Sequence, residues 1–449
     1  MGWILAHGLG SRSDLPVPLW MAQYGAATAL IVSFTALGTF WPTPRLEGDA
    51  AAARGRPLPA WLQRFADARA TRIGLRVLGL LLAGATLICA AFGPDSSATN
   101  PAPTWVYVWF WVGLVPASLL FGPVWKLLNP LRTIAAGLGR ITGDPDGKGM
   151  RPYPPGLGYW PGAIGLAAFA WLELVYLYRD KPSTLLVFLT AYGLVQLTAA
   201  RVYGQGWFAR GDAFEVYSSL LGHLSPVGRR ADGQLVLRNP LIGLAQLQPE
   251  PGLVALVCVL LGSTAFDGLS RTRLWNDLII DVGPLTNALL GTAGLIAAIG
   301  VVALTFTFAT QASRRFRRRD PAGIQDDRLD RRFAHSLVPI LVGYTIAHYF
   351  SLLVFQGQAG YILASDPFDR GWNLFGTADW EINLLAVSTT AIAIIQVAAI
   401  VTGHVVGVVA AHDRAMVVFR GRDRIRGQYL LLSTMVFYTV SGIALLVGT

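Results

Sequence analysis

The chain has 449 residues, of which 53% are hydrophobic and only 14% are charged. A soluble domain carries about 25% charged residues, so the composition excludes an ordinary soluble protein. Several apolar runs of about 20 residues indicate many membrane-spanning helices instead. The net charge of +10 would suggest a nucleic-acid partner in a soluble protein, but basic cytoplasmic loops of a membrane protein explain it equally well.

The apolar runs predict an all-α, polytopic bundle of about ten transmembrane helices that forms one integral membrane domain over residues 1–449. The predicted spans are roughly 20–40, 74–92, 104–122, 161–178, 183–200, 252–268, 285–310, 335–356, 384–412 and 428–447.

The basic residues alternate along the loops of this predicted bundle. Arginine and lysine gather in the loops 41–73, 123–160, 201–251, 311–334 and 413–427, and are scarce in, or balanced by acidic residues in, the loops between them. Because basic loops stay on the cytoplasmic side, we expect an even number of spans in the plasma (inner) membrane, with both termini outside. The lipid bilayer is then a partner of the chain, and the net charge gives no reason to expect nucleic acid.

Two cytoplasmic loops contain predicted amphipathic helices, over residues 124–141 and 211–226, with apolar residues at helical spacing. We expect both to lie at the inner membrane surface. In the first, Asn129 suits an N-cap and Pro130 the first helical position.

Four residues inside or beside the predicted spans could carry chemistry. His348 and His404 lie deep in their spans, Tyr344 lies one helical turn before His348, and Asp267 ends the span 252–268. Ionisable groups at membrane depth are costly and mark functional sites. Each histidine could also be an ordinary packing residue that hydrogen-bonds a neighbouring helix.

As functional groups, Asp267, His348 and His404 would be metal ligands or general bases, with Tyr344 orienting His348. The metal would be a divalent ion such as zinc. No zinc motif such as HExxH is present, so the ligands would have to come from different spans.

Charged residues near the membrane surfaces have simpler explanations. The sequence His412-Asp413-Arg414 closes the span 384–412 and is interpreted as an anchor at the cytoplasmic boundary. The outer loops carry Asp366, Asp379 and other acidic residues, which are either solvated loop residues or a vestibule that attracts cations toward Asp267 and His348.

Four stretches of the chain resemble one family of bacterial multi-pass membrane proteins. They are AHGLGSRSDLPVPLW, RNPLIGLAQL, LLGSTAFDGLSRTRLW and GHVVGVVAAHDRA. Members of this family are labelled fenitrothion hydrolases, so the resemblance implies hydrolysis of a phosphotriester. It supplies no catalytic motif that could be carried over to particular residues. Such a reaction needs an activated water and a Lewis acid or cationic group at the phosphoryl oxygen.

Three functions remain open on the sequence. The first is a membrane-embedded, metal-assisted hydrolase acting on phosphoric ester bonds. The second is a transporter or permease for a small apolar or cationic solute, in which the intramembrane histidines relay protons. The third is a non-catalytic membrane partner that binds other proteins through its basic face. No P-loop is present, which disfavours a pump driven by ATP.

Overall fold

The computed structural model describes residues 18–317, 328–419 and 421–447. The first 17 residues, which hold most of the first stretch that carries the resemblance, lie outside this part of the chain, and so do Arg318 and Arg319 of the most basic loop.

The chain is a multi-pass helical membrane protein. In its described part, eight helices are long and apolar enough to cross a membrane, and a bent pair of shorter helices would make a ninth span. The eight are Leu19–Phe40, Arg69–Phe92, Ala102–Phe121, Pro182–Tyr203, Pro284–Phe316, Leu329–Ser365, Thr389–Val418 and Arg426–Leu445. The prediction of many spanning helices is therefore confirmed, whereas the count of ten is not.

The difference in the count comes from two predicted spans. The segment predicted at 161–178 forms helix α10 (Trp160–Leu174), whose 15 residues cover only ~22 Å at a rise of 1.5 Å per residue. The hydrocarbon core of a bilayer is ~30 Å thick. The segment predicted at 252–268 forms α15 (Leu253–Leu269), which is followed by α16 (Arg273–Ile279) at an angle of 78°.

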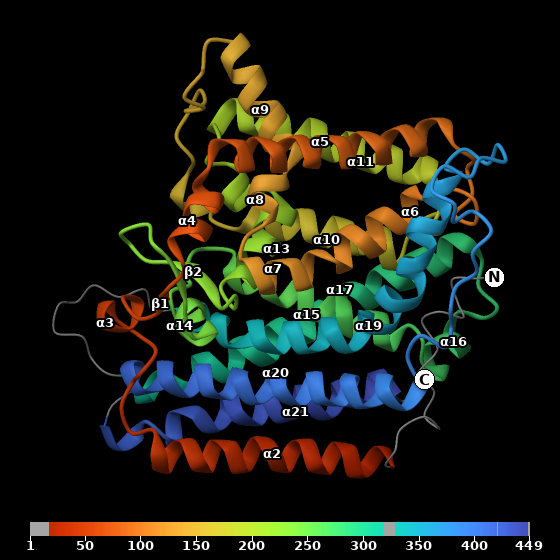
Figure 1. Cartoon of the computed structure of the whole chain (residues 1–449). Coiled ribbons are helices and arrows are strands. Elements are labelled where there is room, and N and C mark those ends of the chain that lie inside the picture. The colour runs from red at the N-terminus through yellow and green to blue at the C-terminus, as the bar shows by residue number, and fades with distance from the viewer. Residues whose placement is uncertain (1–17, 318–327, 420, 448–449) are drawn as a thin grey trace. The chain divides into compact units, whose positions relative to one another are not determined.

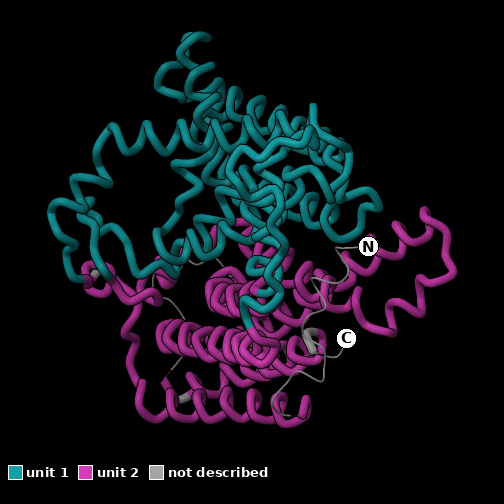
Figure 2. The backbone as a smooth tube through the Cα atoms, turned by 45° about the vertical axis from the view of Figure 1, so that its right-hand side comes forward, with its two compact units in different colours: residues 1–7, 56–237, 351–387 teal, residues 8–55, 238–350, 388–449 magenta. Residues whose placement is uncertain are grey.

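The chain divides into two compact units, which are coloured separately in Figure 2. The first holds described residues 56–237 and 351–387. Its elements before the shared helix α19 are β1 (Arg56–Pro57), α4 (Ala60–Asp67), α5 (Arg69–Phe92), α6 (Ala102–Thr104), the π-helix η1 (Trp105–Val112), α7 (Leu114–Phe121), α8 (Trp125–Leu128), α9 (Pro130–Ile141), η2 (Pro155–Leu157), α10, α11 (Pro182–Tyr203), α12 (Phe208–Gly211), α13 (Ala213–Gly222), β2 (Val227–Arg229) and β3 (Leu235–Leu237). The three strands form a small antiparallel sheet in the order β1-β3-β2.

The second unit holds described residues from the start of α2 to Gly55, then 238–350 and most of the chain after 388. Its elements are α2 (Leu19–Phe40), α3 (Asp49–Ala52), α14 (Pro240–Ala245), α15, α16, α17 (Pro284–Ala312), η3 (Ser313–Phe316), α18 (Leu329–Phe333), η4 (Ala334–Leu337), α20 (Thr389–Val418), η6 (Gly421–Asp423), η7 (Arg426–Gln428) and α21 (Tyr429–Val447). Helix α19 (Val338–Ile362) begins in this unit and ends in the first, where η5 (Leu363–Ser365) follows it.

Within the second unit, α2, α20 and α21 lie side by side (Figure 1). One stripe of α2 is buried against the other two helices, and its members recur every three or four residues: Ala22, Ala26, Leu30, Phe34 and Leu37. This spacing puts them on one face of a helix. The other faces of α2 are exposed and apolar, as expected for a surface that meets lipid.

Helices α19 and α20 approach each other through glycines. A Cβ atom added at Gly343 would lie 2.4 Å from the carbonyl oxygen of Ala399, and one at Gly403 would lie 2.5 Å from that of Pro339. Small residues allow such close backbone approach between membrane helices.

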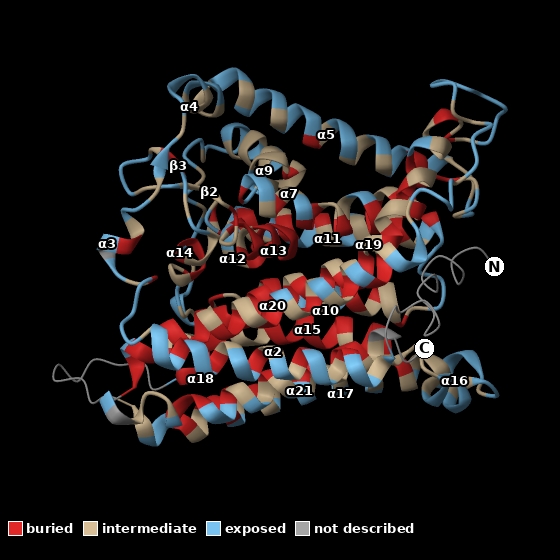
Figure 3. Cartoon of the chain, turned by 60° about the horizontal axis from the view of Figure 1, so that its bottom comes forward, coloured by how far each residue is buried: buried red, intermediate tan, exposed pale blue. Residues whose placement is uncertain are grey.

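The interpretation of residues 211–226 as a helix at the membrane surface needs correction. Helix α13 is buried on all its faces, whereas a surface helix would keep one face in water (Figure 3). Its polar side chains are satisfied inside the first unit: Ser218 bonds Ser118 at 2.8 Å and Glu215 pairs with Arg132. Helix α9, in contrast, has no buried residue, and its place at the membrane surface stays a prediction.

Candidate functional site

The structure brings together two of the predicted site residues in the second unit. His348 on α19 bonds Asp267 on α15, with 2.5 Å between Nε2 and Oδ2, although the two are 81 positions apart in the sequence. Both side chains are buried. A buried carboxylate next to an imidazole is an arrangement that can hold and release a proton.

Two further side chains contact Asp267. Arg271, one turn later, donates from Nη2 to Oδ1 at 2.6 Å, and the hydroxyl of Tyr349 lies 3.4 Å from Oδ2. The carboxylate is therefore held between a guanidinium and an imidazole, which offsets the cost of burying its charge. Arg271 is not among the residues predicted from the sequence, although its spacing of four from Asp267 is a usable signal.

The break between α15 and α16 lies beside this cluster, and local side chains explain why the helix ends there. The hydroxyls of Ser270 and Thr272 donate to the carbonyls of Asp267 and Leu269 at 2.8 and 2.7 Å, at the end of the helix where carbonyls lose their intrahelical partners. Thr272 also accepts from the backbone N–H of Trp275 and so caps α16.

His404 and Tyr344 form a separate contact. Their ring centroids are 5.8 Å apart with an edge-to-face geometry. The hydroxyl of Tyr344 donates to the carbonyl of Tyr438 at 2.5 Å, whereas the hydrogen-bond partner of His348 is Asp267. The role of Tyr344 in orienting His348 stays a prediction.

His404 is fully buried and only partly satisfied. Its Nδ1 lies 2.9 Å from the carbonyl of Ile400, so that nitrogen carries the proton, while Nε2 has no hydrogen-bond partner within the described residues. Buried polar atoms without a partner are rare.

The metal-ligand role of Asp267, His348 and His404 also stays a prediction. Within residues 18–317, 328–419 and 421–447, no group of three or more His, Cys, Asp or Glu side chains is placed so that it could hold a metal ion. Asp267 and His348 bond each other directly.

In the segment interpreted as an interfacial anchor, His412 and Asp413 are buried. Asp413 accepts hydrogen bonds from Trp41 Nε1 at 2.8 Å and from the backbone N–H groups of Arg45 and Leu46 at 2.6 and 3.1 Å. His412 lies 3.1 Å from the carbonyl of Trp41. His412 and Asp413 therefore bind the chain after α2 to the end of α20. These hydrogen bonds give the buried polar groups of both segments their partners.

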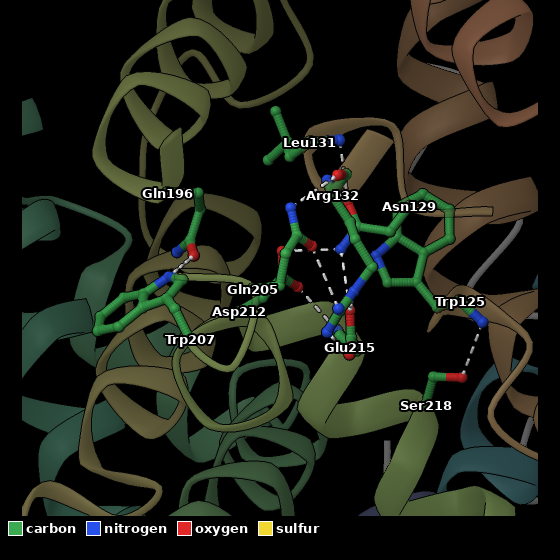
Figure 4. A network of polar contacts seen from close by, with 10 residues as sticks. All are labelled: Trp125, Asn129, Leu131, Arg132, Gln196, Gln205, Trp207, Asp212, Glu215 and Ser218. Carbon is green, nitrogen blue, oxygen red and sulfur yellow. Dashed lines mark hydrogen bonds and ion pairs between the residues drawn. The ribbon is translucent and has the colours of Figure 1, made fainter. Parts of the chain in front are cut away.

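The first unit contains a polar network that the sequence analysis did not identify (Figure 4). Asn129 caps α9 and Asp212 caps α13, and the side chains three positions later, Arg132 and Glu215, form an ion pair. Arg132 donates to both oxygens of Glu215, at 2.9 and 2.6 Å, and Asn129 donates to Asp212 and Glu215 at 3.3 Å. The cap at Asn129 with Pro130 in the first turn confirms that prediction.

The charges of this network do not balance. Asp212 and Glu215 are both buried, and the Arg132 guanidinium forms its ion pair with Glu215. Burial raises the pKa of Asp212 to about 7, the backbone N–H of Glu215 opposes this, and the Glu215 charge adds to it. The sequence Asp-Ala-Phe-Glu is a capping-box pattern and could have revealed the cap, but not the partner helix.

Comparisons of the chain with models of protein families, with curated proteins and with solved structures find no match.

Proposed function

We propose that the protein is a membrane carrier for a small solute, in which the Asp267–His348 pair takes up and releases a proton. The observation that supports this is a buried acid–base pair beside a broken membrane helix. Carriers commonly place their ion and substrate sites at such breaks, because the ended helix frees backbone groups and admits side chains there.

The charges around the pair leave a place for a proton on the imidazole. Asp267 and Arg271 carry opposite charges and lie 2.6 Å apart, so they compensate each other when His348 is neutral. Nε2 of His348 faces the carboxylate, so a proton on this nitrogen lies in the hydrogen bond between the two side chains. The acid–base pair gains a positive charge without leaving any member unpaired.

Nitrogen-15 NMR of the reconstituted protein tests this proton uptake. With six histidines in the chain, the signal that disappears in His348→Gln is assigned to His348. We expect this signal to report a proton gained by His348 when the pH of the sample is lowered. A His348 signal that keeps one protonation state throughout would overturn the proposal.

A hydrolase is the second candidate, and Arg271 is the observation that favours it. In this function, Asp267 would orient His348 as the general base for a water, and the Arg271 guanidinium would stabilise the phosphoryl oxygen. The water oxygen would bond to phosphorus, the bond to the aryl oxygen would break, and His348 would keep the water proton until it is released to solvent.

Fenitrothion, the substrate that the resemblance implies, separates the two functions. Turnover releases a nitrophenolate, which is followed by its absorbance. The control is Asp277→Asn, a change at an exposed carboxylate. Turnover that is abolished in His348→Gln and retained in this control would support the hydrolase and contradict the carrier. We expect no turnover above that of empty liposomes.

A further inference from the structure

An apolar cavity of about 370 Å³ lies among five helices of the second unit. Its walls come from α15, α16, α17, α19 and α21, and four of its lining residues are aromatic: Trp275, Tyr344, Phe437 and Tyr438. Ligand pockets measure about 300–1,000 Å³, and an apolar cavity of about 150 Å³ already binds benzene. The cavity therefore has room for a compact molecule larger than one aromatic ring.

The polar side chains of the lining have their hydroxyls engaged elsewhere. Tyr344 donates to the carbonyl of Tyr438, Tyr438 to that of Val302 at 2.9 Å, and Ser441 to that of Phe437 at 2.5 Å. Trp275 packs edge-to-face on Phe266. A molecule that brought several polar groups into this space would lose hydrogen bonds to water, because the three hydroxyls already donate to backbone carbonyls.

The cavity and the acid–base pair lie on different faces of α15. Leu261, Ala265 and Leu269 line the cavity, and Asp267 is rotated by ~200° from Ala265 at 100° per residue. Tyr344 is a wall of the cavity, lies one turn from His348 and touches the ring of His404. A molecule in the cavity would contact α19 through Tyr344 without reaching the carboxylate.

The side of the cavity is formed by residues that are exposed on spanning helices. Val301 is 49% exposed and Phe437 is 52% exposed, and both belong to helices that are long and apolar enough to cross the membrane. A molecule dissolved among the acyl chains can therefore enter from the bilayer.

We propose that the cavity is the solute site, and that the solute is a compact apolar molecule about the size of two fused aromatic rings. This inference rests on the proposed carrier function. Four aromatic side chains favour an aromatic occupant, since ring pairs add about 0.5–1.5 kcal/mol to the burial of apolar surface. The volume favours a compact molecule over an extended chain.

Binding of radiolabelled naphthalene to the protein in nanodiscs tests the inference. Empty nanodiscs measure the naphthalene that partitions into lipid, and this uptake does not saturate. We expect saturable binding of one naphthalene molecule per chain. The affinity should fall at least tenfold in Ala298→Phe, which fills the cavity, and in Ala265→Leu, which fills it partly. Ile296→Phe is the matched control, because Ile296 lies on the same helix and is 64% exposed.

Three results would overturn the inference. One is naphthalene uptake that never exceeds partition into lipid. Another is saturable binding of equal size in Ala298→Phe, Ala265→Leu and Ile296→Phe. A phospholipid that stays bound in a one-to-one ratio and keeps naphthalene out would also count against it, because the occupant would then be an acyl chain. The protonation of His348 is measured separately by NMR, so the carrier function can stand when this inference fails.

Discussion

At the scale of single residues, His404 poses the clearest question, because it is fully buried and its Nε2 lacks a partner within the described residues. An unsatisfied buried polar atom costs about 1–3 kcal/mol. Its neighbour Tyr344 offers a ring face, and the Tyr344 hydroxyl is engaged with Tyr438.

We therefore expect His404→Phe to keep or raise the melting temperature of the purified protein. Phenylalanine removes the unsatisfied nitrogen and keeps an edge-to-face contact with Tyr344. Thermal unfolding followed by intrinsic fluorescence measures the effect. A fall of more than a few degrees would show that the imidazole makes a stabilising contact that the structure does not contain.

The sequence alone identifies individual residues better than pairs. Asp267 and His348 were recognisable because ionisable residues are rare in apolar runs, but their hydrogen bond depends on how α15 packs near α19. His412 and Asp413 were read as an anchor in the interface, since a helix end is a common place for charge. Their partners Trp41, Arg45 and Leu46 are more than 360 positions away, so no local pattern could reveal them.

At the scale of elements, α13 illustrates what an amphipathic pattern leaves undecided. Apolar and polar faces predict that one face is buried, and the sequence does not say what covers the other. In this structure the polar face meets Arg132 and Ser118 instead of water. Asp212, which caps α13, is buried with it.

The buried Asp212 predicts a particular dependence of stability on pH. Its pKa is raised to about 7 in the folded protein from an ordinary value of 3.8. The contribution of Asp212 to the free energy of unfolding is fully present below the ordinary pKa. As the pH rises, this contribution is lost by about 1.4 kcal/mol per pH unit, and the loss ends above pH ~7.

The difference in melting temperature between the natural protein and Asp212→Asn isolates this contribution. We expect the natural protein to lose stability relative to the variant between pH 5 and 7, and the difference to stay constant above pH ~7. Asp67→Asn, a change at an exposed carboxylate whose pKa is lowered by Arg229, is the control and lacks this downward slope. A difference that does not vary with pH would contradict the burial of Asp212.

The glycine contact between α19 and α20 gives a second prediction for an element. Gly343→Ala places a methyl group 2.4 Å from the carbonyl of Ala399, so the helices must separate and the melting temperature falls by several degrees. Gly300→Ala on α17 meets no atom within 4 Å and keeps or raises stability, because alanine is the better helix former. Equal effects of the two changes would contradict the close packing of α19 and α20.

At the scale of the whole molecule, composition and loop charge establish a multi-pass membrane protein, whereas the number of crossings depends on helix lengths that hydropathy does not resolve. Helix α10 is 15 residues long, and α15 bends into α16. The number of crossings is even or odd depending on whether each of these two segments crosses the bilayer. An even number puts both termini on the same side of the membrane.

Labelling of single cysteines in intact cells tests the sidedness predicted from the basic loops. With the two natural cysteines replaced by serine, we expect an impermeant maleimide to label Asp379→Cys and to leave Asp232→Cys unlabelled until the cells are opened. Both positions are exposed, so access to the reagent and not burial decides the result. Labelling of both in intact cells would contradict the predicted topology.

The carrier function is tested most directly by the charge that moves when proteoliposomes on a solid-supported membrane meet a rapid drop in pH. We predict a transient current that integrates to about one elementary charge per chain and disappears in Asp267→Asn and His348→Gln, but not in Asp277→Asn. No current above that of empty liposomes, or a current that Asp267→Asn and His348→Gln leave unchanged, would contradict the account.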